Sequence, residues 1–571
     1  MHADPDVVGD IRTSYELHSF RDQLWFRLNA WPHRSEAMAA AEQLHADQTA
    51  NGVRVVRLEH YVDYDFTDNI VIFKRLNNDV TESDPLAPAN EAGAIFCWRQ
   101  VGDFFRERGR EELRAQLSRY MEEKRVTVLE LIHSDKHSID LDNAGTILQG
   151  VFQKVALPLA QASGGKIAAS TIYKDMMSLW SQLVLQLRND ANAVKVVKLE
   201  PAKFVEVAAQ LEKQFGVEVG NYHLVRTIVA YLLDAKTWME KLDRLGQLFT
   251  PECERKHVRI LDLQASEILS AAGPFRELLD EGADRVSAIC TVANLFGGTY
   301  KTNSGTIPRG LAVINTLMND SRMPRTRSTL RKRLLREIIS RAPLLPGRNL
   351  LQELEGLNAI IRHLNEVAPS LIRDEEITDG LVQRAARGIT VQSVSECVGT
   401  VQKVSDKLGM LCKLAQLAPG SINKAAVFRL FRSAMPPDDL VRICLREGGN
   451  RLAAVNTLAD VMKTLVAAPL DETTRTEILG AVDSALLDIF KTDIMLAPNR
   501  TYADRISLLF KVCSGIQLSE GKARALAVET IGREFRNPNF LPAFKSRFKS
   551  DAEMKDVLLK VKAFLAGDRG G

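Results

Sequence analysis

The chain has 571 residues, of which 45% are hydrophobic and 26% charged, and its formal net charge is only +3. This balance excludes a largely disordered chain, because disorder goes with low hydrophobicity and high net charge. It also excludes a generally basic protein, so any site for a polyanion must be local. The length predicts about three or four domains, or one long repetitive architecture.

The cysteines and the absence of long apolar runs bear on the compartment. The seven cysteines are odd in number, widely scattered and free of any CxxC pair, which argues against a disulfide framework or a structural zinc site. The first residues lack the basic start and apolar core of a signal peptide, and no apolar run is long enough to span a membrane. We therefore expect a cytoplasmic protein that is not inserted in a membrane.

Residues 12–76 are expected to form a small α/β module of order β-α-β-β. The segment that ends in "LWFRLNAW" alternates with the two-residue period of a half-buried strand. A helix follows, with Ser35 as its cap and Gly52 just past its end. Two more strands, "VRVVRLEHYV" and "NIVIFKR", flank the acidic segment "DYDFTD", which is interpreted as a plain hairpin turn. Modules of this size usually bind or sense something.

Beyond residue 76 the pattern changes to that of helices. A polar stretch rich in proline and small residues is expected to act as a linker. After it, apolar residues recur at steps of three and four, which is typical of helices buried along one side. The predicted divisions are a tail 1–11, the module 12–76, a linker 77–93, a helical domain 94–260, a helical segment 261–350, a helical-hairpin domain 351–565 and a tail 566–571. The chain is predicted to be mainly α.

The dipeptide Ala-Pro recurs every 50 residues, at Ala368-Pro369, Ala418-Pro419 and Ala468-Pro469. The preceding segments, "LNAIIRHLNEVAP", "KLGMLCKLAQLAP" and "TLADVMKTLVAAP", align without gaps and share apolar positions. A fixed period is typical of stacked helical units, so we predict α-solenoid-like helical hairpins in the C-terminal half. The alternative is that hairpins of similar length give equal spacings without a true repeat.

The stretch with the most uneven balance of charge is "RMPRTRSTLRKRLLREIISRAP", which is rich in arginine and lysine and has Glu337 as its one acidic residue. From about Ser328 an apolar stripe predicts a helix docked on the helical body, with Ser328 or Thr329 as its cap. An extended arm is expected before the helix and a cationic ridge along its outer side. The candidate partner-binding residues are Arg322, Arg325, Arg327, Arg331, Lys332, Arg333, Arg336 and Arg341.

Three interpretations of this basic stretch are open. Its arginines can be solvated and partly neutralised by acids of neighbouring helices, which is the simplest interpretation. They can instead meet an acidic protein surface, or bind a polyanion such as nucleic acid or anionic lipid. The stretch has no aromatic residue to stack on bases, which counts against single-stranded nucleic acid. An acidic protein partner is therefore preferred to nucleic acid.

The best metal candidate is the segment "ELIHSDKHSIDLD". On a continuous helix Glu130, His133, His137 and Asp140 would share one face, as metal-binding helices arrange their ligands. The Ser-Asp pair in the middle is typical of a helix cap, so the helix is expected to stop near His133 and restart nearby. A polar loop between helices is the simpler interpretation.

No dinucleotide, nucleophile-elbow or HExxH motif occurs, and no cofactor is indicated. We therefore expect a non-catalytic regulatory or scaffolding protein that binds other proteins through helical surfaces, with the N-terminal module as a recognition or sensing domain. The alternatives are a metal-dependent enzyme that uses the region Glu130–Asp140 and a polyanion binder that uses Arg322–Arg341.

Overall fold

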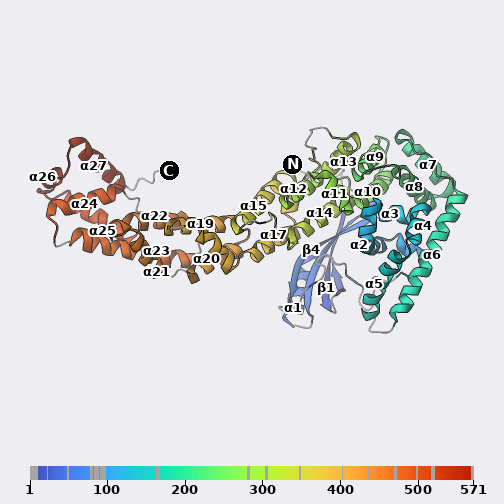
Figure 1. Ribbon diagram of the computed structural model, residues 1–571, viewed down its shortest axis with the longest axis horizontal. Coiled ribbons are helices and arrows are strands. Elements are labelled where there is room, and N and C mark those ends of the chain that lie inside the picture. The colour runs from blue at the N-terminus through green and yellow to red at the C-terminus, as the bar shows by residue number, and fades with distance from the viewer. Residues whose placement is uncertain are drawn as a thin grey trace. The chain divides into compact units, whose positions relative to one another are not determined.

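The computed structural model describes residues 11–21, 24–47, 50–77, 82, 89–90, 98–162, 167–279, 283–301, 307–345, 347, 349–401, 403–434, 437–467, 472–496, 499–515 and 521–566. Most of the predicted linker and most of each predicted tail lie outside these residues. Within them the protein is mainly α, with one small sheet near the N-terminus, and the predicted fold class is confirmed (Figure 1). The chain divides into two compact units, unit 1 (Met1–Ala342 with Ile360–Gly380) and unit 2 (Pro343–Ala359 with Leu381–Gly571).

The N-terminal module is a four-stranded antiparallel sheet with strand order β2-β1-β3-β4. Its elements are β1 (Ile11–Arg21), β2 (Leu24–Trp31), α1 (Arg34–Ala46), β3 (Gly52–Tyr61), the 3-10 turn η1 (Val62–Tyr64) and β4 (Phe66–Leu76). The sequence analysis merged β1 and β2 into one strand, whereas the structure pairs them as a hairpin. That boundary was missed because the segment "FRDQL" between them carries no glycine, proline or Asn-Gly signal.

Helix α1 covers one face of the sheet. Small residues on the helix, Ala37 and Ala41, let it approach the strands closely. The core between helix and sheet is completed by Leu17, Val53, Val55, Ile70 and Ile72. The described part of the predicted linker also rests on the sheet, since Glu82 accepts hydrogen bonds from Trp25 Nε1 (2.6 Å) and Lys74 Nζ (2.8 Å).

The helices of unit 1 follow the module. They are η2 (Val101–Phe104), α2 (Glu107–Lys124), α3 (Val128–His133), α4 (Asp135–Asn143), α5 (Thr146–Ala162), α6 (Ala169–Ala193), η3 (Pro201–Lys203), α7 (Phe204–Phe215), α8 (Val217–Leu232), α9 (Trp238–Gln247), α10 (Arg255–Ser270), α11 (Gly273–Leu278), α12 (Arg285–Phe296), α13 (Arg309–Asn319), α14 (Pro324–Ile339) and α16 (Pro369–Ile372).

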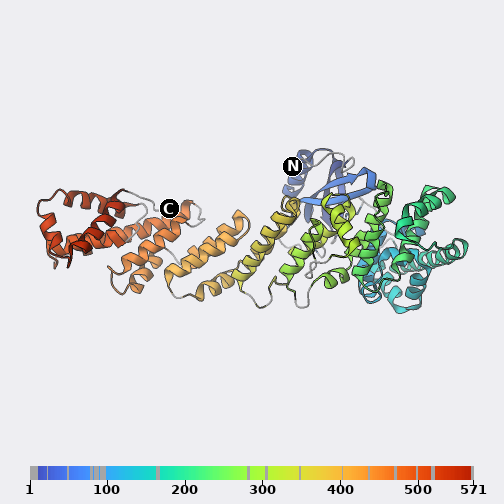
Figure 2. The same cartoon turned by 90° about the horizontal axis from the view of Figure 1, so that it is seen from above.

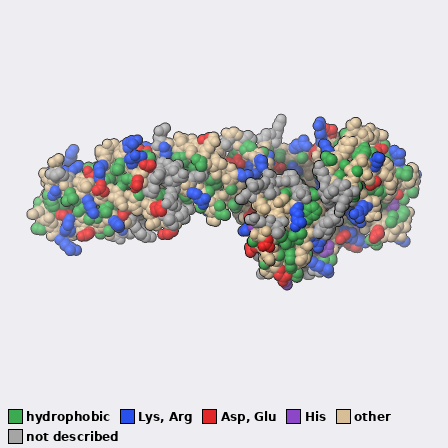
Figure 3. All heavy atoms as spheres, turned by 90° about the horizontal axis from the view of Figure 1, so that it is seen from below, with side chains coloured by type: hydrophobic (Ala, Val, Ile, Leu, Met, Phe, Trp, Pro, Cys, Tyr) green, Lys and Arg blue, Asp and Glu red, His purple; other side chains and the backbone are tan. Residues whose placement is uncertain are grey.

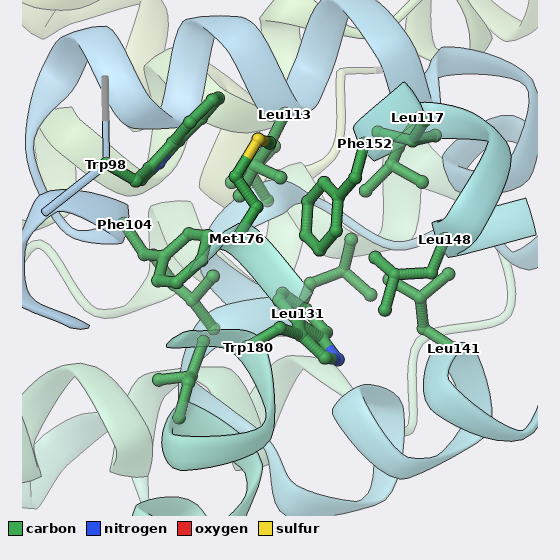
Figure 4. Close-up of a cluster of buried hydrophobic side chains, with 14 of the residues drawn as sticks. Trp98, Phe104, Leu113, Leu117, Leu131, Leu141, Leu148, Phe152, Met176 and Trp180 are labelled. Carbon is green, nitrogen blue, oxygen red and sulfur yellow. The ribbon is translucent and has the colours of Figure 1, made fainter. Parts of the chain in front are cut away.

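A large apolar core joins η2 to α2, α3, α4, α5 and α6 (Figure 4). Trp180 is fully buried at its centre, with the rings of Phe104 and Phe152 set edge-on to it at 5.8 and 6.4 Å. The three-and-four stripe of α6 buries Ile172, Met176 and Trp180, as its periodicity predicted.

Helices α9 and α13 cross at two glycines. A Cβ on Gly246 would lie 2.1 Å from the carbonyl oxygen of Gly310, and a Cβ on Gly310 would lie 1.9 Å from that of Asp243. The backbone nitrogen of Gly310 donates to Asp243 Oδ1 at 2.7 Å. This backbone-to-backbone crossing is possible because neither glycine carries a side chain.

Unit 2 is entirely helical in the residues described. Its helices are α18 (Val391–Gly399), α19 (Val404–Leu417), α20 (Ser421–Ala434), α21 (Pro437–Glu447), α22 (Ala454–Ala467), α23 (Glu472–Ile489), the π-helical segment η4 (Phe490–Met495), α24 (Tyr502–Gly515), α25 (Lys522–Glu534), α26 (Phe540–Lys545) and α27 (Asp551–Ala566). Two further helices, α15 (Leu350–Val367) and α17 (Glu375–Gly388), contribute residues to both units.

Each helix of unit 2 packs on neighbours close in sequence (Figure 2). Helix α19 contacts α20 and α22, α22 contacts α21 and α23, and α23 contacts α25. The Ala-Pro positions follow helix ends, since α15 ends at Val367 and α19 at Leu417, while Ala468-Pro469 lies outside the described residues. None of the helices in the described ranges has both the length and the apolar character needed to cross a bilayer.

Candidate functional site

The basic stretch forms α14, and the helix begins earlier than predicted. Pro324 occupies its first turn, where the missing N–H of proline is tolerated. Asp262 of α10 accepts from the backbone nitrogens of Arg325 (2.9 Å) and Thr326 (3.0 Å) and therefore caps the helix from a neighbouring element. The predicted extended arm and the predicted cap at Ser328 or Thr329 are therefore wrong. Burial raises the pKa of Asp262 to about 6.

Arg331 points into unit 1 and is only 4% exposed. Its Nη2 donates to the carbonyl oxygen of Asn69 at 2.7 Å and lies 3.5 Å from Asp68 Oδ1, both on β4. Its Nη1 lies 2.9 Å from Glu376 Oε2 and 3.5 Å from Asp374 Oδ2, at the start of α17. Burial opposes the charge of Arg331, but the three carboxylates raise its pKa. The guanidinium thus joins the sheet, α14 and α17.

Three further arginines of α14 lie over aromatic rings. The guanidinium carbons of Arg325, Arg327 and Arg333 lie 4.7, 4.1 and 4.0 Å from the ring centroids of Phe66, Phe296 and Phe275, respectively. Each also donates to a backbone carbonyl oxygen, those of Asp65 (2.7 Å), Met318 (2.8 Å) and Ala271 (3.3 Å). Burial lowers the pKa of all three guanidinium groups. Their hydrogen-bonding capacity is largely used within unit 1.

The other four candidates are more accessible. The side chains of Arg322, Lys332, Arg336 and Arg341 are half-exposed or exposed, and they make no hydrogen bond or ion pair among the described residues. The eight basic residues therefore do not form one continuous outer ridge, because half of them are turned toward the protein's own sheet, rings and carbonyl groups. Binding of a partner by the stretch stays a prediction for the four outward residues.

The region Glu130–Asp140 is divided at Ser134, as the sequence predicted. Helix α3 ends at His133, and Ser134 caps α4 by accepting from the backbone nitrogen of His137 (3.4 Å). The continuous helix that would align four ligands does not form. Glu130 is instead buried in an ion pair with Lys241 Nζ at 2.7 Å. Among the residues that the structure describes, no group of three or more His, Cys, Asp or Glu is placed to hold a metal ion.

His133 and Arg325, one residue from each predicted set, line the same cavity. This cavity, called here the junction cavity, has a volume of about 380 Å³ and lies between η1–β4, α3, α8, α10 and α14. The tip of the sheet is held beside it, since Tyr64 and Phe66 pack on Val258 of α10 and Tyr64 Oη donates to the carbonyl oxygen of Arg322 (2.8 Å). The floor is apolar and contains Phe105, Val225, Ile260 and Leu263.

Two guanidinium groups with spare donors face the junction cavity. Arg325 Nε is buried and has no hydrogen-bond partner, and the side chain of Arg259 makes no hydrogen bond or ion pair among the described residues. Tyr222 Oη is occupied, because it donates to Asp190 Oδ2 at 2.7 Å. Burial lowers the pKa of His133 to about 4, so its ring is neutral at pH 7. The cavity can bind an anionic group on an apolar body.

The chain matches no family model, no curated protein and no solved structure. The site is therefore interpreted from its own residues. Sequence reasoning missed the carboxylates that meet Arg331 and the cavity residues Arg259 and Tyr222. These residues come from separate elements, and the sequence between them carries no motif that would have joined them.

Proposed function

We propose that the protein is a non-catalytic regulatory or scaffolding protein that binds another protein through the helical surface of unit 2. The observation that carries this proposal is the arrangement of unit 2, in which helices pack on near neighbours in sequence. Stacked helical hairpins of this kind present an extended surface, which such proteins commonly use for binding.

Large apolar side chains on this surface support the proposal. Ile422 of α20 is 76% exposed and Val391 of α18 is 62% exposed, and these two helices contact each other. Figure 3 shows apolar side chains among interspersed acidic and basic ones on the visible face of unit 2. A protein partner with an apolar centre and a mixed-charge rim suits such a surface.

The test is affinity purification of the intact protein from its own cells, with nuclease present. Ile422→Asp is expected to lose a partner that the wild-type protein recovers, because the charge would be buried at the interface. The matched control is Leu185→Asp on α6 of unit 1, where the side chain is 59% exposed. Equal recovery by all three proteins would contradict binding at this surface.

For the N-terminal module we infer a recognition role at the junction cavity, which Asp65, the residue between η1 and β4, helps to line. The spare donors of Arg259 and the Nε of Arg325, beside an apolar floor, favour a small carboxylate with an apolar body. The test is a thermal-shift screen of aromatic and aliphatic carboxylates against wild type and Arg259→Ala. Stabilisation of the wild type alone would support the role, and no difference between the proteins would refute it.

The basic stretch adds a second expectation about the partner. If the partner surface is acidic, its contact in unit 1 is made by the four outward residues and not by the buried ones. Arg336→Glu combined with Arg341→Glu is then expected to weaken recovery of the partner while leaving the fold unchanged, since neither side chain has a partner within the part of the chain that the structure describes. Unchanged recovery would remove the basic stretch from the interface.

A further inference from the structure

A second cavity, called here the lysine cavity, lies in unit 1 where the ends of α2 and α8 meet the start of α9. Its volume is about 370 Å³. Four basic side chains line it, those of Lys124, Arg125, Lys236 and Lys241, together with His137. Among the described residues that line it there is no carboxylate. This composition differs from that of the junction cavity, whose floor is apolar.

Lys241 does not contribute free charge to the lysine cavity. Its Nζ is 2.7 Å from both carboxylate oxygens of Glu130 and 2.5 Å from the carbonyl oxygen of Arg125. All three of its protons are therefore engaged. This buried pair is neutral as a whole and serves to hold the end of α2 against α3 and α9.

Lys124 and Lys236, by contrast, have free ammonium groups. Both side chains are exposed, and neither ammonium makes a hydrogen bond or an ion pair among the described residues. Glu240, four residues after Lys236, accepts from Arg244 Nη2 (2.6 Å) and from the backbone nitrogen of Lys236 (2.8 Å), and not from the ammonium group of Lys236. The positive charge of the two lysines is therefore left for a ligand.

Arg125 holds the wall of the lysine cavity in place. It ends α2 in the left-handed region with φ of 55°, an uncommon conformation for a residue with a side chain. Its Nη1 donates to the carbonyl oxygen of Lys236 at 2.7 Å. This bond ties the two lysine-bearing segments together and leaves the guanidinium as a third positive charge.

His137 adds a directional group. Its Nε2 is buried and has no hydrogen-bond partner among the residues that the structure describes, although the residue lines a polar cavity. A buried nitrogen without a partner is costly unless a ligand or water satisfies it. Lys124 in the last turn of α2 also interacts favourably with the helix dipole, but that interaction does not satisfy the imidazole nitrogen of His137.

We propose that the lysine cavity binds a phosphate group, with Lys124, Lys236 and Arg125 supplying charge and His137 Nε2 donating a hydrogen bond. Phosphate fits because it offers several acceptor oxygens and about two negative charges. Pockets for small organic ligands begin at about 300 Å³, so the volume admits a phosphate carried on a small metabolite as well as the free ion.

Calorimetric titration of the full chain with inorganic phosphate and, separately, with glycerol phosphate tests the proposal. Lys124→Ala combined with Lys236→Ala is expected to weaken binding at least about tenfold, since charge-assisted hydrogen bonds to phosphate are lost. The matched control is Lys195→Ala combined with Lys198→Ala, two exposed lysines of unit 1, which removes equal charge elsewhere.

The two titrants distinguish the sources of the phosphate group. Tighter binding of glycerol phosphate would identify a phosphorylated metabolite, and equal or tighter binding of inorganic phosphate would identify the free ion. His137→Phe, which keeps a ring but removes the nitrogen, is expected to weaken binding while leaving the melting temperature close to that of the wild type. Absence of binding at millimolar concentration, or equal binding by both double variants, would overturn the proposal.

Discussion

The two units differ in where they keep their charged side chains. In unit 1, buried ion pairs join elements far apart in sequence: Glu267 lies between Arg110 (2.9 Å) and Arg114 (2.7 Å), and Arg331 meets Asp68. In unit 2 the ion pairs of the described residues lie mainly at the surface. Arg451, for example, is 47% exposed where it pairs with Asp488 and Asp493.

This difference indicates which contacts determine the fold of each unit. Burying charge is costly unless partners are placed accurately, so the arrangement of unit 1 depends on long-range polar contacts. Unit 2 depends mainly on apolar packing between helices that are near neighbours in sequence, although Arg384 with Glu353 is a buried exception. Substitutions of charged residues are therefore expected to change the free energy of unfolding by different amounts in the two units.

The largest effect is expected from Arg331→Met. The substitution leaves Asp68, Asp374 and Glu376 buried without their cation, which is expected to destabilise unit 1 by about 3–5 kcal/mol. The measurement is urea unfolding followed by circular dichroism. The matched control on the same helix is Arg336→Met, which removes an exposed charge with no ion pair to any described residue and should change stability by less than about 0.5 kcal/mol. Similar losses in both variants would mean that Arg331 is not a structural cation.

Gly246→Ala is expected to cause the next largest loss of stability. Its Cβ would meet the backbone of α13, so the two helices must separate, at about 1–3 kcal/mol. Gly480→Ala in α23 of unit 2 provides the contrast, because no other atom lies within 4 Å of the added Cβ. That variant is expected to gain about 0.5–1 kcal/mol from helix propensity. A loss in Gly480→Ala would show that α23 is packed more closely than the structure has it.

The pH dependence of unit 1 is expected to carry a contribution from Asp262. Its folded pKa of about 6 lies above the usual value for aspartate, so the folded state binds the proton more tightly. The contribution of Asp262 protonation to the free energy of unfolding is largest below about pH 4. It is lost as the pH rises through about 6, and it amounts to about 3 kcal/mol in all. His133, with its pKa lowered to about 4, acts in the opposite sense, with stability lost as the pH falls.

Asp262→Asn separates the two contributions. As the pH falls from 7 to 4, Asp262 should stabilise the wild type relative to the variant, because the asparagine cannot take up a proton. The unfolding free energy of the wild type minus that of the variant should therefore increase. Urea unfolding at several pH values measures this difference. A difference that does not vary with pH would contradict the raised pKa of Asp262.

The smallest effect is expected from Arg451→Ala in unit 2. Both of its carboxylate partners are partly exposed, so the pair is screened by water and the loss should be below about 1 kcal/mol. Adding salt should reduce that loss further. A loss as large as that of Arg331→Met would remove the distinction between the units.

Local patterns in the sequence predicted local structure well. The stripe of apolar residues predicted which side of α6 is buried, and the Ser-Asp pair predicted the break between α3 and α4. The start of α14 was wrong because its cap, Asp262, comes from another helix and leaves no mark in the neighbouring sequence. The hairpin of β1 and β2 was missed because its turn lacks the residues that usually signal one.

The sequence by itself determined the helical class, the position of the small sheet and the concentration of basic residues in α14. Periodicity, caps and turns act over a few residues, and so they can be read without a fold. Only the tertiary structure decided which way the arginines point. Arg331 and Asp68 are 263 positions apart, and the long arginine side chain can turn inward or outward from the same helical position. Its direction is set by the carboxylates that folding brings to it. The tertiary structure likewise brings together the lysines and the histidine of the lysine cavity, which come from separate elements.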